Sequence, residues 1–288
     1  MVVGLNALKD QGVRRKASEA EQGMPGQPIH RQLILILVAF HPSREEVEAL
    51  QGSLSQLPAS IGYGVVVNDH RPGEPVEALF AQADRHLCNR DNPGYGRAVN
   101  RLAGLLPAEL PYVAALNTDL TWVPGTFERM LSWLDSHPDV VLAVPKIVDP
   151  DGAIQRLCKR DPTVLGLFSR RFLPDWLKPR WLRAYDGWYA MADADYGGVL
   201  RVPYLSGCCM VLRHAAFRQV GGFDERFFLY LEDADLTRAL RAVGDTVHLP
   251  LACVVHAWGR GNHRSWRLTL VNFSSAWLYF WKWGWRWV

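Results

Sequence analysis

Long apolar runs, paired cysteines and a strong net charge are all missing from this 288-residue chain. No uninterrupted run of about 18 apolar residues occurs, so the sequence predicts no helix that spans a bilayer. The five cysteines are scattered and never spaced Cys-x-x-Cys, which excludes a zinc-ribbon pattern and argues against a disulfide framework. We therefore expect free thiols in a reducing compartment.

The net charge of +3 is too small, and too little clustered, for a nucleic-acid partner. The basic residues 14–16 are not followed by an apolar stretch, so no secretory signal is predicted. Residues 1–30 lack hydrophobic periodicity and are interpreted as a disordered tail. With 49% hydrophobic residues, the rest of the chain has ample material for one globular domain over residues 31–265.

Apolar runs alternate with helical spacing between residues 32 and 256. Strands are predicted at 32–40, 64–67, 86–89, 112–116, 140–148, 204–212 and 247–256. Helices are predicted at 43–57, 76–83, 95–105, 126–136 and 232–243. This alternation predicts an α/β fold with a mainly parallel central sheet flanked by helices, in which ligands bind beyond the carboxyl ends of the strands. Residues 149–203 are less regular and are interpreted as a lobe over that site.

Acidic residues follow two of the predicted strands directly. An aspartate that follows a strand often serves only as a turn residue. For Asp69 alone, this structural role and a role in binding carry equal weight. Asn117-Thr118-Asp119 is different because it places two oxygen-bearing side chains on one face of a strand end. A carboxylate there can hold a hard divalent cation that keeps positions open for phosphate.

A third acidic group, Glu232, Asp233 and Asp235, opens the helix predicted from residue 232. Capping and the helix dipole explain one or two carboxylates in a first turn, but not three within four residues. A carboxylate here suits a general base that accepts a proton from a hydroxyl. His256 ends a strand and precedes a glycine-containing loop with Arg260 and Arg264, and arginine matches phosphate oxygens well.

These motifs, in this order, resemble the family 2 glycosyltransferases, and within them the bacterial rhamnosyltransferase-like members. The likeness runs from about residue 33 to about residue 275. Its most specific part is the string Gly-Gly-Phe-Asp-Glu-Arg-Phe-Phe at 221–228, continued by residues 230–238. The segment 92–100 resembles the family's loop and helix after the third strand, and 117–119 resembles a degenerate Asp-x-Asp metal motif.

The resemblance implies a GT-A fold and a role for each of these residues. Asp233 would be the catalytic base, with Glu232 and Asp235 in support, and Asp119 and His256 would hold Mg²⁺ or Mn²⁺. Nucleotide contacts would come from Phe40, Asp69, Asn92, Gly94, Asn100 and Asn117, and diphosphate contacts from Arg260 and Arg264.

The activity implied is an inverting transfer of a sugar from a nucleoside-diphosphate donor to a hydroxyl of a glycan acceptor, one that is expected to be lipid-linked. The preferred donor is dTDP-L-rhamnose, while UDP-sugars such as UDP-galactofuranose stay open. A non-catalytic carbohydrate- or lipid-binding relative would not need the acidic cluster at 232–235. A sugar nucleotidyltransferase would need a glycine-rich basic loop after the first strand, where this chain has Ala-Phe-His-Pro-Ser at 39–43.

Residues 266–288 are strongly aromatic, with five tryptophans between 277 and 287 beside Lys282 and Arg286. Indole rings favour the membrane–water interface, and cations add attraction to anionic lipids. We therefore expect this tail to dock on the inner face of the cell membrane, which makes the protein cytoplasmic and peripheral. The alternative is an amphipathic helix that folds back on the domain.

Overall fold

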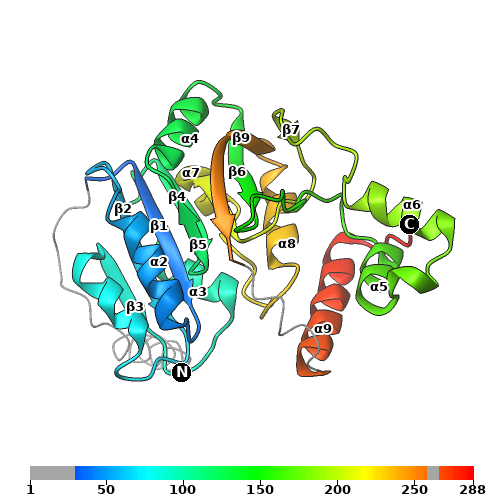
Figure 1. Cartoon of the computed structure of the whole chain (residues 1–288), viewed down its shortest axis with the longest axis horizontal. Coiled ribbons are helices and arrows are strands. Elements are labelled where there is room, and N and C mark those ends of the chain that lie inside the picture. The colour runs from blue at the N-terminus through cyan, green and yellow to red at the C-terminus, as the bar shows by residue number, and fades with distance from the viewer. Residues whose placement is uncertain (1–29, 258–265) are drawn as a thin grey trace, which may run out of the picture.

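The computed structural model describes residues 30–257 and 266–288. The expectations for the tail at 1–29 and for Arg260 and Arg264 lie outside these residues. In the described part, a nine-stranded sheet has the order β3-β2-β1-β4-β8-β6-β9-β5, with β7 also paired to β9 (Figure 1). The strands are β1 Leu33–Ala39, β2 Ile61–Val67, β3 Arg85–Cys88, β4 Tyr112–Asn117, β5 Leu120–Trp122, β6 Val140–Val148, β7 Leu200–Arg201, β8 Cys209–Arg213 and β9 Asp245–His256.

Helices cover both faces of this sheet and form a separate group at one end. They are α2 Arg44–Leu54, η1 Pro75–Gln82, α3 Tyr95–Ala103, α4 Thr126–Asp135, α5 Val164–Phe172, η2 Asp175–Leu177, α6 Arg180–Tyr189, α7 His214–Gln219, α8 Glu232–Leu240 and α9 Trp266–Trp283. In Figure 1, α5, α6 and α9 lie together at the end of the molecule opposite β3, with α8 between them and the sheet.

The α/β fold with a central sheet flanked by helices is confirmed. Strands β3, β2, β1 and β4 run parallel, as the continuous apolar runs predict, because strands buried on both faces need apolar residues at every position. The second half is mixed: β8 runs antiparallel between β4 and β6, while β6 and β9 are parallel. The sheet is thus less parallel than predicted, because strand direction depends on long-range pairing.

The lobe at residues 149–203 contains more helix than its sequence suggests. It folds into α5, η2 and α6, and two arginines in the last turn of α5 complement the helix dipole. The strand predicted at 204–212 begins only at Cys209, because residues 204–208 leave the sheet and run past the start of α8. There the amide of Gly207 bonds the side chain of Asp233.

Helix α9 packs on the domain through one side. Tyr279 and Phe280 are buried with Tyr204, Phe227 and Leu231 in a small second core. Burying side chains of this size contributes roughly 1.5–3 kcal/mol each. The opposite side of the helix is exposed. Across the described residues, no helix combines the length and the hydropathy that a bilayer crossing requires, and the five cysteines are free thiols.

Candidate active site

Asp233 is the second residue of α8, and its carboxylate is held by three donors. Oδ1 accepts hydrogen bonds from the Tyr204 hydroxyl at 3.1 Å and from the Ala234 amide at 2.8 Å. Oδ2 accepts from the amide of Gly207 at 2.9 Å. A side chain at position 207 would place its Cβ 3.1 Å from the Cβ of Asp233, so glycine permits this approach. The carboxylate therefore has a fixed orientation.

The turn before α8 is strained. Tyr230 and Leu231 have φ values of 70° and 62°, in the left-handed region that residues with a Cβ rarely adopt. Such residues cost about 1–3 kcal/mol each and persist only where the surroundings enforce them. Here the burial of Leu231 in the second core enforces the turn. The turn lets α8 begin directly behind Leu231 and present its first residues to a cavity.

Glu232 precedes Asp233 but has very different surroundings. Its side chain is buried, and Oε2 has no hydrogen-bond partner among the described residues. Burial, together with the neighbouring charge of Asp233, raises the pKa of Glu232 to about 8. At neutral pH Glu232 is therefore a protonated acid beside a carboxylate that is fully hydrogen-bonded.

Asp119 and His256 meet through the pairing of two strands. Asp119 lies between β4 and β5, and the antiparallel pairing of β5 with β9 places Leu120 opposite His256. As a result, Nε2 of His256 lies 3.2 Å from Oδ2 of Asp119. The other carboxylate oxygen, Oδ1, is buried and has no hydrogen bond among the described residues.

Gln155 fixes the orientation of the His256 ring. Its Nε2 donates to Oδ1 of Asp149 at 2.8 Å and to the backbone oxygen of His256 at 3.0 Å. Its Oε1 must then accept from Nδ1 of His256, 2.9 Å away. This bond places a proton on Nδ1 and turns Nε2 toward Asp119, which is the tautomer that a metal-ligating histidine uses.

Asp119 and His256 thus supply one carboxylate and one imidazole, and the unpartnered Oδ1 of Asp119 fits a divalent cation. Within residues 30–257 and 266–288, no group of three or more His, Cys, Asp or Glu side chains is placed to hold a metal. A cation bound here would need further ligands from outside this set, as the phosphate oxygens of a nucleotide can provide.

A cavity of about 710 Å³ joins these parts of the site. Asp233, Glu232 and His256 line it, together with Asn117 at the end of β4. Since Asp119 contacts His256, the structure brings positions 119, 233 and 256 to one place. Four cationic side chains also line the cavity: Arg156, Lys159, Arg170 and Arg171.

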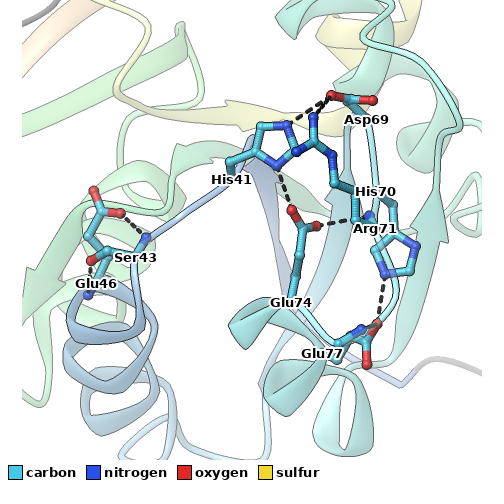
Figure 2. A network of polar contacts seen from close by, with 9 residues as sticks. His41, Ser43, Glu46, Asp69, His70, Arg71, Glu74 and Glu77 are labelled. Carbon is cyan, nitrogen blue, oxygen red and sulfur yellow. Dashed lines mark hydrogen bonds and ion pairs between the residues drawn. The ribbon is translucent and has the colours of Figure 1, made fainter.

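Phe40 and Asp69, two of the predicted nucleotide contacts, follow the adjacent parallel strands β1 and β2. Asp69 accepts hydrogen bonds from His41 at 2.9 Å and Arg71 at 3.1 Å, and the other nitrogen of His41 contacts Glu74 (Figure 2). The bond from His41 is the main cause that lowers the pKa of Asp69, and the bond to Glu74 is the main cause that raises the pKa of His41. The side chain of Phe40 is exposed. This edge of the sheet is therefore polar, ordered and open.

Asn92, Gly94 and Asn100 connect α3 to the chain that leads into α8. Oδ1 of Asn92 accepts from the amide of Gly94 at 3.0 Å. Gly94 has a φ of 96°, and a Cβ there would lie 2.4 Å from the backbone oxygen of Phe228. Asn100 bonds both the backbone amide and the backbone oxygen of Phe223, at 2.9 and 2.8 Å. The structure gives these three residues bracing contacts rather than places in the Asp233 cavity.

Asp235 points away from Asp233. Its carboxylate accepts from Nζ of Lys282 at 2.9 Å and from the indole nitrogen of Trp283 at 2.7 Å, both on α9. Lys282 also bonds Asp224 at 2.9 Å. Bonds from Arg226 and then Lys282 hold the pKa of Asp224 far below its usual value. The third carboxylate of the motif therefore fastens α9 to α8.

Several residues of the cavity carried no signal in the sequence. Gln155, Lys159 and Arg170 belong to the irregular lobe, and Tyr204 and Gly207 lie in a segment predicted as strand. The one available clue was the concentration of basic residues between 156 and 171, which has no hydrophobic period to assign it a face.

Comparison with known proteins identifies the class of this site. The profile of "Glycosyl transferase family 2" matches residues 64–221, more than half of the chain. The chain is also 32% identical, over 233 residues, to N-acetylglucosaminyl-diphospho-decaprenol L-rhamnosyltransferase of Mycobacterium tuberculosis, covering 73% of this chain and 74% of the relative. The chain belongs to glycosyl transferase family 2, and it is a glycosyltransferase similar to rhamnosyltransferases.

A shorter match joins the chain to the amylovoran biosynthesis glycosyltransferase AmsE of Erwinia amylovora, at 37% identity over 45% of this chain and 50% of the relative. Among solved structures, the mannosyltransferase PcManGT from Pyrobaculum calidifontis, in complex with GDP-Man and Mn²⁺, matches with a TM-score of 0.57 at 14% identity, covering 93% of this chain and 71% of that one. GalNAc-T7 with UDP, GalNAc and Mn²⁺ matches with a TM-score of 0.56 at 12% identity, covering 90% of this chain and 54% of that one. These likenesses show the GT-A fold.

Proposed function

We propose that this glycosyltransferase is an inverting enzyme that transfers L-rhamnose from dTDP-L-rhamnose to a hydroxyl of a lipid-linked glycan. The observation that carries the proposal is the convergence of Asp233, Asp119 and His256 at one cavity. The name of the relative from Mycobacterium tuberculosis supports both the rhamnosyl donor and an acceptor on a lipid diphosphate. A UDP-sugar such as UDP-galactofuranose is the alternative donor.

The proposed reaction is a single displacement. Asp233 accepts the proton of the acceptor hydroxyl while the hydroxyl oxygen forms a bond to the anomeric carbon. The bond from that carbon to the β-phosphate oxygen breaks, and the nucleoside diphosphate leaves on the opposite face. The bonds from Tyr204, Gly207 and Ala234 keep the carboxylate of Asp233 oriented toward the cavity. Inversion follows because one base acts and no carboxylate serves as nucleophile.

Asp119 and His256 would hold Mg²⁺ or Mn²⁺ against the diphosphate, where the cation would neutralise the charge of the leaving group. The buried, unpartnered Oδ1 of Asp119 and the Gln155-oriented ring of His256 support this assignment. Asn117, in the same cavity, and Phe40 and Asp69, at the neighbouring strand ends, are the proposed nucleotide contacts.

The test combines a donor panel with one substitution. Wild-type protein with Mg²⁺ or Mn²⁺ is offered dTDP-rhamnose, UDP-galactofuranose and UDP-glucose, and slow donor hydrolysis and transfer are measured. We expect activity with dTDP-rhamnose that chelation abolishes. Asp233→Asn should lower turnover roughly 10²–10⁴-fold, the usual contribution of a general base.

The matched control is Asp193→Asn, because Asp193 is an exposed aspartate of the lobe that does not line the cavity. It should act like wild type. If Asp233→Asn folds and keeps more than about a tenth of the wild-type turnover, Asp233 is not the base. If the protein turns over a UDP-sugar but not dTDP-rhamnose, the donor is the alternative, a UDP-sugar.

The proposed place of action is the cytoplasmic face of a membrane, to which the protein binds peripherally. Helix α9 carries an outward stripe of exposed apolar residues at helical spacing: Trp266, Leu270, Phe273, Trp277 and Trp281. Such a stripe is typical of an interfacial helix, and the acceptor proposed above would be embedded in the same bilayer. The helix both folds back on the domain and leaves this stripe for lipid.

A further inference from the structure

The wall of the Asp233 cavity opposite the sheet is cationic. Lys159 and Arg170 come from the lobe, and α5, α6 and α9 supply the residues around them, among them Tyr189 and Asn272. Asp119 and His256 lie instead on the side of β4, β5 and β9. The positive wall and the proposed donor site are therefore formed by different parts of the fold.

The two cations that form this wall each lie near an aromatic ring. Nζ of Lys159 lies over the Tyr204 ring, 4.5 Å from its centroid, and Cζ of Arg170 lies 6.0 Å from the centroid of Tyr189. Neither makes an ion pair among the described residues. Burial is the main cause that lowers the pKa of Lys159, and the charge of Asp233 acts in the opposite direction.

The charge balance of the cavity also favours a bound anion. Four basic side chains line it, against the carboxyl groups of Asp149, Glu232 and Asp233. Burial, together with the charge of Asp233, raises the pKa of Glu232, so this carboxyl adds little negative charge to the cavity at neutral pH. A nucleoside diphosphate with its divalent cation would add little net charge. Lys159 and Arg170, on the lobe side, are therefore the cations available to a second anionic ligand.

From this geometry we infer that Lys159 and Arg170 form a subsite for a phosphate or diphosphate group on the acceptor. The inference rests on the proposed function and deepens it. One aromatic ring, that of Tyr204, separates Lys159 from Asp233, and the Tyr204 hydroxyl bonds Asp233 directly. A span of one ring is short enough for one sugar of the acceptor to reach both groups. The phosphate and the reacting hydroxyl would then belong to the sugar next to the lipid, bound by its anion and its hydroxyl together.

The surroundings of the wall fit an acceptor that carries a lipid. Arg170 and Arg171 sit on α5, which also exposes Phe168 and Phe172. Phe172 stacks on Phe273 of α9 with ring centroids 5.4 Å apart, which joins the aromatic surfaces of the two helices. A phosphate at Arg170 would then have its lipid chain beside exposed aromatic rings, on the same side of the molecule as the outward stripe of α9.

The test measures binding without transfer. Farnesyl diphosphate, a short probe, is titrated calorimetrically into full-length protein saturated with dTDP and Mg²⁺. Wild type should bind it, and Arg170→Gln should weaken binding about ten-fold, as expected for one charge-assisted contact. Arg183→Gln is the control, because Arg183 is an exposed arginine of α6 that does not line the cavity. It should stay within about two-fold of wild type.

Comparison of probes identifies the group that is recognised. We expect farnesyl diphosphate to bind more tightly than inorganic pyrophosphate, and farnesol to bind least. Equal binding of pyrophosphate would overturn a lipid-linked source, and equal binding of farnesol would overturn recognition of the anion. Binding of farnesyl diphosphate to the free protein but not to the dTDP-saturated protein would place it in the donor site and end the proposal, as would unchanged binding by Arg170→Gln.

These outcomes are separable from those of the donor panel. A protein that binds farnesyl diphosphate through Arg170 but turns over no sugar nucleotide would contradict the proposed function and leave the subsite intact. An active rhamnosyltransferase whose Arg170→Gln variant binds the probe like wild type would contradict the subsite alone.

Discussion

Glu232 and Asp233 are neighbours in the chain, yet the structure gives them different chemistry. Asp233 accepts three hydrogen bonds, while Glu232 is buried with an unpartnered oxygen. A buried carboxyl without donors favours its neutral form, and a carboxylate surrounded by donors favours its charged form. One residue of the pair is thus a hydrogen-bond donor to the cavity and the other a proton acceptor.

The raised pKa of Glu232 makes stability depend on pH. Its folded pKa of about 8 lies above the ordinary 4.5, so between these values the folded protein holds a proton that the unfolded chain releases. This contribution is fully present below about pH 4.5 and is lost as pH rises through 8. The side chain of Glu232→Gln cannot ionise. When the pH is raised from about 5 to about 9, the free energy of unfolding of this variant should therefore fall by about 2–4 kcal/mol less than that of wild type. Urea unfolding at the two pH values measures this difference.

The control for this prediction is Glu109→Gln, a substitution of an exposed glutamate in the segment between α3 and β4. It should follow the wild-type pH dependence. If Glu232→Gln and wild type lose the same stability over this range, Glu232 is not the group that titrates.

The sequence predicted which residues lie near the cavity better than it predicted the directions in which their side chains point. Asp119, Asp233 and His256 were found because the order of motifs is a property of the chain. Asp235 was grouped with Asp233, but residues two apart on a helix point about 200° apart, so both cannot face one cavity. Lys159 and Gln155 were missed because their positions depend on how the lobe folds over the sheet.

At the scale of elements, α8 and α9 are joined by a partly buried charge cluster. Lys282 lies between Asp224 and Asp235, and Trp283 donates to Asp235 from the next position. Removing Lys282 leaves Asp224 with its other partner, Arg226, but leaves the buried Asp235 without a cation, and a buried charge without a counterion is costly. Helix α8, which carries the proposed base Asp233, therefore depends on α9 for part of its stability.

Lys282→Met keeps most of the side-chain length and removes the charge, so it should lower the free energy of unfolding by about 1–3 kcal/mol. Lys282→Arg, the control, should lose less. Adding Asp235→Asn to Lys282→Met should recover part of the loss, because the stranded charge is removed with its partner. Urea unfolding of the single and double variants measures this coupling. A double variant no more stable than Lys282→Met would show that the pair is not coupled.

The strands that the sequence predicted best are those with the simplest environment. β1 and β4 are buried on both faces, so each has an unbroken apolar run, whereas β2 contains two glycines and only its second half, residues 64–67, was predicted. The antiparallel direction of β8 and the three-residue β5 have no local signature, because both depend on partners far along the chain. The packing of α9 could not be predicted for the same reason. Its tryptophans are compatible both with burial against the domain and with exposure at a membrane surface.

At the scale of the whole molecule, exposed aromatic residues gather at one end. Besides the stripe on α9, Trp176 and Trp181 from η2 and α6 are 79% and 62% exposed. Figure 1 places α5, α6 and α9 at the same end, opposite the β1–β3 edge that carries Asp69. Large exposed apolar patches on soluble proteins mark interaction surfaces. A bilayer at this end would leave the proposed nucleotide edge open to solvent.

Replacing Trp277 and Trp281 with serine should weaken binding to anionic vesicles about ten-fold or more, because each indole contributes interfacial affinity. Vesicle sedimentation measures the effect. These substitutions are preferable to removal of the tail, since α9 also stabilises α8. The control is Leu251→Ser, which removes an exposed apolar residue from β9, away from the aromatic end. Sedimentation of the double variant equal to that of wild type would contradict docking through α9.

The position of β9 in the sheet has a consequence for biosynthesis. β9 is inserted between β6 and β5, so β5 has no strand to pair with until residues 245–256 have left the ribosome. Asp119 is translated long before His256, and a contact over so many residues forms slowly. The nascent chain therefore holds the β1–β4 half of its sheet early, while the Asp119–His256 pair forms only near the end of synthesis. A truncated translation product would have the proposed nucleotide edge without the Asp119–His256 pair.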